Sequence, residues 1–108
     1  MKSFNQKVYD IVKHIPYGMV INYGTIAKLI GSPQSARIVG YAMHSLPEPD
    51  KTPWHRVVLK DGSIPDFSHG SLQYKLLKKE GISFIGKKVD MSKHLWDGDE
   101  EDEENIFL

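Results

Sequence analysis

The chain has 108 residues and an ordinary hydrophobic content of 40%, which suits one domain with a modest core. It contains no cysteine, which excludes disulfides, thiolate metal sites and cysteine nucleophiles. No apolar run reaches the ~20 residues of a membrane span and no signal peptide is visible, so we expect an intracellular protein with no membrane contact. The five histidines are scattered and include no His-x-x-x-His pair, so neither a metal site nor a cofactor is expected.

The net charge of zero conceals an uneven distribution of charge along the chain. Residues 1–96 hold all 14 basic side chains and seven acidic ones, a net +7, whereas residues 97–108 hold seven acidic side chains. A basic domain beside an acidic segment favours a polyanionic ligand such as nucleic acid, although lysines that serve solubility alone would give the same count. We expect residues 1–96 to form one domain and residues 97–108 to be an acidic disordered tail.

The first predicted helix begins after the capping residue Ser3 and ends before the turn at residues 16–18. Its apolar stripe recurs at spacings of four, three and four residues: Phe4, Val8, Ile11 and Ile15. Residues 20–21 favour a short extended piece after this turn.

Two short helices joined by a turn at residues 31–33 are predicted next. Asn22 is the expected cap of the first, and the second extends from about Ser35 to Ser45. Such a pair is typical of a helix-turn-helix unit, in which the second helix is the recognition helix. One face of that helix is separate from its packing face and carries Arg37, Tyr41 and His44.

The second half of the chain is predicted to hold a hairpin, a helix and a wing. The Asp-Gly pair within residues 60–63 predicts a hairpin turn. A helix is expected over about residues 71–80, residues 82–91 should form a strand or extended wing, and Trp96 should pack back on the domain. The predicted fold class is therefore mainly α, a winged helix-turn-helix DNA-binding domain with a short β-hairpin wing.

Four ordered blocks resemble the DNA-binding domain of the O6-alkylguanine-DNA alkyltransferases: IPYG at 15–18, NYGTIA at 22–27, SARIVGYAM at 35–43 and PWHRVV at 53–58. Those enzymes carry Pro-Cys-His-Arg in the last block, where this chain has Trp54. With Trp in place of that Cys, the chain is similar to the alkyltransferase-like proteins over about residues 4–96. The resemblance implies a fold that binds DNA through the minor groove, flips a damaged guanine into a pocket, bends the DNA and passes the lesion to nucleotide excision repair.

The resemblance also implies which residues bind DNA. Arg37 matches an arginine that enters the base stack in place of the extruded nucleotide, a role that suits a planar guanidinium. Tyr23 matches the residue that presses on the 3′ phosphate of the flipped nucleotide and turns it outward. Gln34 and Ser35 lie at the turn before the recognition helix, where backbone N–H groups can hold a phosphate, and Tyr41 shares the face of Arg37. An exposed helix arginine and a half-buried tyrosine are the purely structural alternatives.

Trp54 stands where the enzymes have their alkyl acceptor. An indole has no thiolate and cannot accept an alkyl group, but it can offer an apolar, stacking wall to a flipped base. The segment 65–70 matches the loop that closes over the base, and it holds no arginine, which alkyltransferase-like proteins often carry there. The expected lesion pocket consists of Pro53, Trp54, Val57, Phe67 and Ser68.

His55 and Glu80 match two members of the enzymes' Cys–His–water–Glu relay. Without the cysteine that relay has nothing to activate, so we expect a buried, hydrogen-bonded pair that is a structural remnant and not a catalytic one. Arg56 is expected to organise its loop by bonding local backbone carbonyls.

Together these residues predict a non-enzymatic, monomeric protein of DNA damage recognition. Its expected partners are duplex DNA containing O6-alkylguanine and, by resemblance, nucleotide excision repair proteins. One alternative is a DNA-modifying enzyme with residual activity, such as a glycosylase or an alkyl acceptor that uses another side chain. Another is a winged-helix transcription regulator, which would prefer a particular undamaged sequence and show no preference for alkylated guanine.

Overall fold

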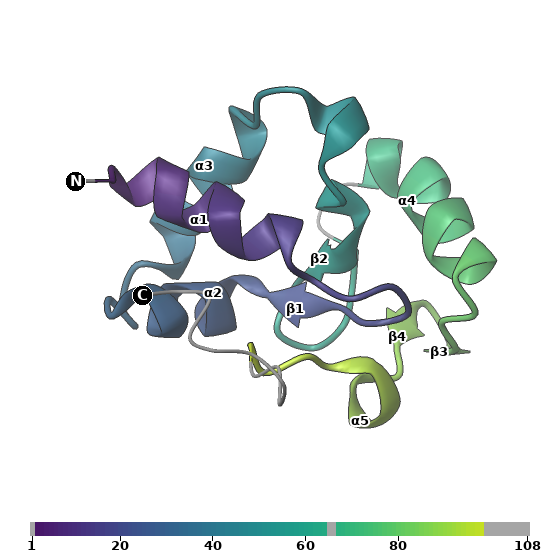
Figure 1. Cartoon of the computed structure of the whole chain (residues 1–108). Coiled ribbons are helices and arrows are strands. Elements are labelled where there is room, and N and C mark those ends of the chain that lie inside the picture. Colours follow the sequence, from purple (N-terminus) through teal and green to yellow (C-terminus); the bar gives the residue numbers. More distant parts are fainter. Residues whose placement is uncertain (1, 65–66, 99–108) are drawn as a thin grey trace.

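The described part of the chain, residues 2–64 and 67–98, forms short helices around two small pairs of strands in the computed structural model (Figure 1). Of residues 67–71 only the backbone is described. In chain order the elements are α1 Phe4–Lys13, β1 Ile21–Asn22, α2 Tyr23–Ile30, α3 Ala36–His44, the 3₁₀ turns η1 Pro49–Lys51 and η2 Trp54–Arg56, β2 Val57–Val58, α4 Phe67–Lys79, β3 Phe84–Ile85, β4 Lys88–Val89 and α5 Met91–His94.

The first two helices begin at the capping residues that the sequence predicts. Ser3 Oγ accepts a hydrogen bond from Gln6 N at 3.2 Å at the start of α1. Asn22 Oδ1 accepts one from Thr25 N at 2.8 Å at the start of α2. Each bond satisfies a helix N–H that has no partner within the helix. Gly31 ends α2 with a φ of 95°, a left-handed conformation that glycine adopts without steric cost.

Helices α1, α2 and α3 pack around one apolar core. Val8, Val12, Ile26 and Val39 are fully buried there. Tyr9 Oη donates a hydrogen bond to the carbonyl oxygen of Ala42 at 2.9 Å, which joins α1 to α3. This packing fixes the orientation of α3, the predicted recognition helix.

A parallel pair of strands joins the two halves of the domain. Strand β1 pairs with β2, with Ile21 opposite Val57 and Asn22 opposite Val58. Trp96 is 3% exposed and its backbone N–H donates to the Val20 carbonyl oxygen at 2.7 Å, so the prediction that Trp96 packs back on the domain is confirmed. Because β1 and β2 run parallel, η2, which directly precedes β2, is placed beside the segment that precedes β1.

The β-hairpin of the structure is formed by β3 and β4, which pair antiparallel within the predicted wing at 82–91. The hairpin predicted at residues 60–63 is wrong. A tight turn does form there, with Leu59 N–H bonded to the Ser63 carbonyl oxygen at 2.9 Å. However, β2 before this turn pairs with β1 and not with the segment that follows. The Asp-Gly signal therefore located a turn but could not say which strands pair.

The predicted loop at 65–70 and the start of the following helix also need correction. Helix α4 begins at Phe67, so residues 67–70 are helical, and the helix starts four residues before the predicted Ser71. Gly70 lies inside this helix, where a glycine costs only about 1 kcal/mol. The side chains of Phe67 and Ser68 lie outside the described part, and so do residues 99–108 of the predicted tail. Among the helices of the described residues, none combines the length and apolar composition that crossing a bilayer requires.

Candidate nucleic-acid interface

The recognition helix α3 presents one face to the core and another to solvent. Val39 and Ala42 are buried, whereas Arg37 is exposed and Tyr41 is 62% exposed. Ile38 on this helix is also exposed. The structure confirms the prediction that Arg37 and Tyr41 lie on a face of α3 separate from its packing face.

Tyr23, the first residue of α2, lies against this helix. A methyl group placed at Gly40 would come 3.9 Å from Tyr23 Cε2, so the ring covers the one residue of α3 that has no side chain. Gly40 follows Arg37 by three residues, which places both on neighbouring turns of one helix face. Burial raises the pKa of the Tyr23 phenol, so the hydroxyl stays protonated and remains a hydrogen-bond donor at neutral pH.

The turn between α2 and α3 is held by short backbone and side-chain bonds. Ser35 N–H donates to the Ser32 carbonyl oxygen at 2.9 Å, and the two serine hydroxyls lie 2.6 Å apart. Ser35 occupies the capping position of α3 but makes no side-chain bond to the helix. The first N–H groups of α3 are therefore not capped by Ser35, and Gln34 beside them is exposed. A helix start of this kind can hold a phosphate oxygen.

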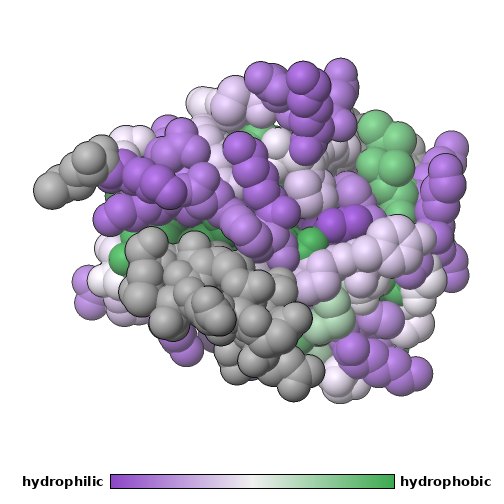
Figure 2. All heavy atoms as spheres, viewed as in Figure 1, coloured by the Kyte–Doolittle hydropathy of each residue, from purple (hydrophilic) through white to green (hydrophobic). Residues whose placement is uncertain are grey.

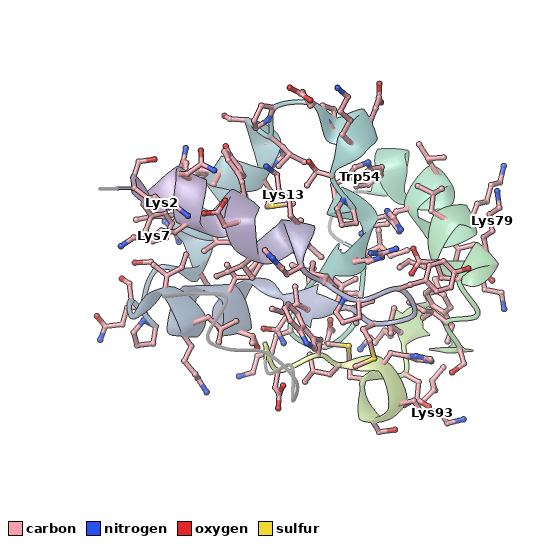
Figure 3. The ribbon with its side chains drawn as sticks, viewed as in Figure 1. Lys2, Lys7, Lys13, Trp54, Lys79 and Lys93 are labelled. Carbon is pink, nitrogen blue, oxygen red and sulfur yellow. The ribbon has the colours of Figure 1, made fainter. Side chains whose placement is uncertain are left out.

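Trp54 lies in η2, the short turn that packs against α4. Its half-buried ring meets the His55 ring edge-on, with centroids 6.1 Å apart and planes at 86°. Figure 3 shows Trp54 beside the N-terminal end of α4, the helix that begins at the predicted closing segment. Pro53, directly before it, is also half-buried.

Val57 is placed differently from the other predicted pocket residues. It lies in β2 opposite Ile21, is 2% exposed and belongs to the apolar core. The structure therefore does not bring the Val57 side chain to the surface with Pro53 and Trp54. The alternation of a strand explains this, because consecutive residues of β2 face opposite sides and both sides are covered here.

Behind Trp54 lies a buried cluster centred on Glu80. His55 Nε2 is 2.6 Å from Glu80 Oε2, and the side chains are 14% and 6% exposed. Arg56 Nε donates to both Glu80 oxygens, at 3.1 and 3.0 Å, and Arg56 Nη2 lies 2.9 Å from Oε2. Gly18 N–H donates to Glu80 Oε1 at 2.8 Å. His55 and Glu80 are thus in direct contact, with no gap for a bridging water between them.

Electrostatics keep Glu80 ionised. Burial alone raises the pKa of this carboxyl group, but the hydrogen bonds from Arg56, Gly18 and His55 outweigh burial, and the net pKa lies below its ordinary value. Arg56 also donates from Nη1 to the Ile15 carbonyl oxygen at 2.8 Å. Arg56 was expected to bond local backbone carbonyls; it does bond a carbonyl, but Glu80 and Ile15 lie 24 and 41 residues away in the chain, so neither partner is local.

Two further residues, which the sequence reasoning missed, hold η2 in place. Gln73 on α4 is 3% exposed, and its Nε2 donates to the carbonyl oxygens of His55 and Val57, both at 3.0 Å. Arg56 Cζ lies 5.6 Å from the centroid of the Tyr17 ring, and the Tyr17 hydroxyl donates a hydrogen bond to the Lys79 carbonyl oxygen. The sequence pointed to Gln73 only as a polar residue at a position of α4 where helical spacing predicts an apolar one.

An exposed recognition helix packed on a shorter helix, with a hairpin wing beyond, defines a winged helix-turn-helix DNA-binding domain. The sequence model of the family described as "6-O-methylguanine DNA methyltransferase, DNA binding domain" matches residues 3–82. The DNA base-flipping protein of Escherichia coli strain K12 is 42% identical over 99 residues, which cover 87% of this chain and 74% of that protein. Alkyltransferase-like protein 1 of Schizosaccharomyces pombe is 40% identical over 104 residues, which cover 89% of this chain and 96% of that protein.

The structural comparison agrees with these matches. The crystal structure of S. pombe Atl1 in complex with damaged DNA containing O6-carboxymethylguanine superposes with a TM-score of 0.75 at 38% identity, and the match covers 89% of this chain and 98% of that one. The chain belongs to the family of the 6-O-methylguanine DNA methyltransferase DNA-binding domain. Its predicted resemblance to alkyltransferase-like proteins and its predicted fold class are confirmed. The chain holds no cysteine that could accept an alkyl group, and two of its relatives are named as a base-flipping protein and an alkyltransferase-like protein.

Proposed function

We propose that this protein recognises O6-alkylguanine in duplex DNA through the minor groove, flips the damaged nucleotide out of the stack and does not repair it. The observation that carries the proposal is Trp54, which replaces the family's acceptor cysteine while the scaffold around it is kept. A relative of 40% identity is named for its likeness to alkyltransferases, and a structural neighbour was solved on DNA containing O6-carboxymethylguanine.

Tyr23 and Arg37 supply the means of flipping. They lie on adjacent helices, with the Tyr23 ring on Gly40 and Arg37 one turn away on α3. In this proposal Tyr23 presses on the phosphate of the flipped nucleotide while the Arg37 guanidinium fills the vacated place in the stack. Flipping costs a few kcal/mol of unstacking, and a planar cation that stacks and hydrogen-bonds offsets part of that cost. Gln34, Ser35 and Tyr41 would hold the neighbouring backbone.

Trp54 and Pro53 would form one wall of the lesion pocket, with the first turn of α4 opposite. Phe67 and Ser68 remain proposed members of that pocket. The Glu80 cluster would support this wall. His55 and Arg56 follow Trp54 in η2, and both side chains are bonded to the Glu80 carboxylate. Since Glu80 occupies His55 Nε2 directly, we infer that this pair holds Trp54 in position and carries no proton to a reacting group.

The cellular role that we propose is to mark the lesion for nucleotide excision repair. The protein would act as a monomer, because base flipping needs one recognition helix at one lesion, and it would act in whichever compartment holds the DNA. A pocket that binds but does not react leaves the lesion in place, so the bound protein itself becomes the signal.

The test is competition binding at one stated salt concentration, because phosphate contacts make every affinity salt-dependent. A labelled duplex with one O6-methylguanine is competed with the same duplex containing guanine. We expect a clear preference for the lesion and no change in protein mass after incubation. Equal affinities would contradict lesion recognition, and a methyl adduct on the protein or a released base would instead indicate an enzyme.

A further inference from the structure

The solvent-facing side of α3 differs from that of the two helices packed on it. Helices α1, α2 and α3 are described over their whole length, and of these three only α3 exposes large apolar side chains, Ile38 at 48% and Tyr41 at 62%. Figure 2 shows mostly hydrophilic side chains over α1, the usual surface of a helix that faces water. The exposed side of the recognition helix is therefore partly apolar.

The two apolar side chains are neighbours of Arg37 on this helix. Successive residues of a helix are about 100° apart around its axis, so Tyr41 lies between Arg37 and Ile38. Gly40, which the Tyr23 ring covers, lies on the other side of Arg37. The order around the exposed side of α3 is therefore Tyr23 on Gly40, then Arg37, then Tyr41 and Ile38.

This order decides what Ile38 can touch when α3 meets DNA. If the Arg37 guanidinium occupies the vacated place in the stack, with Tyr23 at the phosphate of the flipped nucleotide, Ile38 lies on the opposite side, against base pairs that remain stacked. An aliphatic side chain makes no hydrogen bond to phosphate, so its favourable contacts are with sugars and base edges inside the groove. Ile38 would therefore be covered by a base pair next to the lesion.

The minor-groove edges of the base pairs differ mainly by one chemical group. An A·T pair presents only acceptors, adenine N3 and thymine O2, whereas a G·C pair adds the 2-amino group of guanine, a hydrogen-bond donor. This amino group projects from the floor of the groove, so an isoleucine placed over it displaces its water partner and offers no acceptor in return. A buried donor without a partner costs free energy, so Ile38 should disfavour G·C at the pair that it covers.

We propose that Ile38 makes lesion binding depend on a neighbouring base pair, with A·T preferred to G·C, because its side chain excludes the guanine 2-amino group. This inference rests on the proposed function, since it requires α3 to enter the minor groove at the flipped nucleotide. Phosphate contacts alone carry no sequence information. A dependence on the neighbouring pair therefore needs a side chain that meets base edges, and Ile38 is placed to be that side chain.

The first experiment varies one base pair while the lesion and the protein stay constant. O6-methylguanine duplexes carry A·T, G·C, inosine·C or diaminopurine·T at the pair on either side of the lesion, and Kd is measured at one stated salt concentration. Inosine lacks the 2-amino group of guanine, and diaminopurine adds that group to adenine. At one of these positions we expect A·T and inosine·C to bind about tenfold more tightly than G·C and diaminopurine·T. Equal affinities at both positions, or inosine·C grouped with G·C, would overturn the proposal.

The second experiment assigns the preference to Ile38. The 2-amino group also adds a hydrogen bond within the base pair, so duplex strength must be separated from contact with the protein. Ile38→Ser introduces a hydroxyl that can accept a bond from the amino group, and we expect the preference to disappear, whereas Ile38→Val should keep most of it. Because Ile38 is exposed, both variants should fold normally. If the serine variant keeps the full preference, duplex strength causes it and the proposal is overturned.

Ile85 on β3 provides the matched control. It is 68% exposed and lies at the other end of the domain from α3 (Figure 1). Ile85→Ser makes the same chemical change and should leave the base-pair preference intact, and an equal loss in both serine variants would overturn the proposal. Failure here is distinguishable from failure of the proposed function. Lesion recognition is read from the lesion-to-guanine affinity ratio in one fixed sequence, and the role of Ile38 from the change in affinity when only the neighbouring pair changes.

Discussion

The two ends of this domain are built in different ways. At the helix-turn-helix end, apolar side chains form the core and the residues proposed to act on DNA, such as Arg37 and Tyr41, extend into solvent. At the α4 end, polar side chains from distant parts of the chain converge on Glu80 beneath Trp54. We infer that side chains at the helix-turn-helix end contribute most of the free energy of DNA binding, and that the Glu80 cluster at the α4 end contributes to the stability of the fold. Substitutions of Arg37 and of Glu80 should therefore separate binding from stability.

The largest effect is expected from Glu80→Ala. Removing one partner of a buried ion pair leaves the other charge without compensation, which costs about 3–5 kcal/mol in the free energy of unfolding. The low end of that range is expected, since the Arg56 side chain retains 16% exposure. Chemical denaturation measures this change. Glu80→Gln keeps the shape and some hydrogen bonds, so it should lose less, and equal losses would show that the charge is unimportant.

Arg37→Ala should have the next largest effect, and on binding alone. Loss of a charged group that stacks and hydrogen-bonds in the DNA costs about 2 kcal/mol, or roughly 30-fold in Kd for the O6-methylguanine duplex. The melting temperature should stay the same because Arg37 is exposed. Lys79→Ala on α4 removes the same charge far from α3 and serves as the control (Figure 3). If both variants weaken binding alike, Arg37 acts only through net charge.

Trp54→Ala should reduce lesion preference by an intermediate amount. Stacking of a base on an aromatic side chain contributes about 1–3 kcal/mol, so the affinity ratio between lesion and guanine duplexes should fall by roughly tenfold. Trp54→Phe keeps an aromatic wall and should retain most of the ratio. A full ratio in the alanine variant would place the flipped base away from Trp54.

Tyr23→Phe tests a smaller contribution, at the helix-turn-helix end. The ring that packs on Gly40 is kept, and only the hydroxyl proposed to meet phosphate is lost. A single hydrogen bond is worth about 0.5–1.5 kcal/mol, so lesion binding should weaken by no more than about tenfold. Tyr23→Ala also removes the ring and should weaken lesion binding further. If phenylalanine and alanine behave alike, the hydroxyl and not the ring turns the nucleotide.

The smallest effect is a dependence of stability on pH at the other end. The pKa of Glu80 lies below its ordinary value of 4.5 in the folded protein, so its contribution to stability is present above that pH and is lost as pH falls through the folded pKa. Unfolding free energy measured against pH should therefore decline below about pH 4.5. The decline should be shallower in Glu80→Gln, and parallel curves would assign it to other carboxylates.

Much of the helix-turn-helix end could be predicted from the sequence because its determinants are local. Ser3 and Asn22 cap helices through bonds that span three residues, Gly31 ends a helix by its own backbone, and the solvent face of α3 follows from helical spacing. The family itself was readable from four short blocks, of which the Trp54 block separated this chain from the enzymes.

Only the tertiary structure decided how the other end is assembled. Arg56 bonds to Glu80 and to the Ile15 carbonyl oxygen, and Gln73 bonds to a carbonyl oxygen beside Trp54. Strand β2 pairs with β1 instead of forming a hairpin. These contacts join positions far apart in the chain. A buried polar group needs a hydrogen-bond partner, and which group is within reach depends on how the elements pack. The sequence by itself determined that Trp54 cannot accept an alkyl group, since indole chemistry is independent of the fold. The structure decided what holds Trp54 in place.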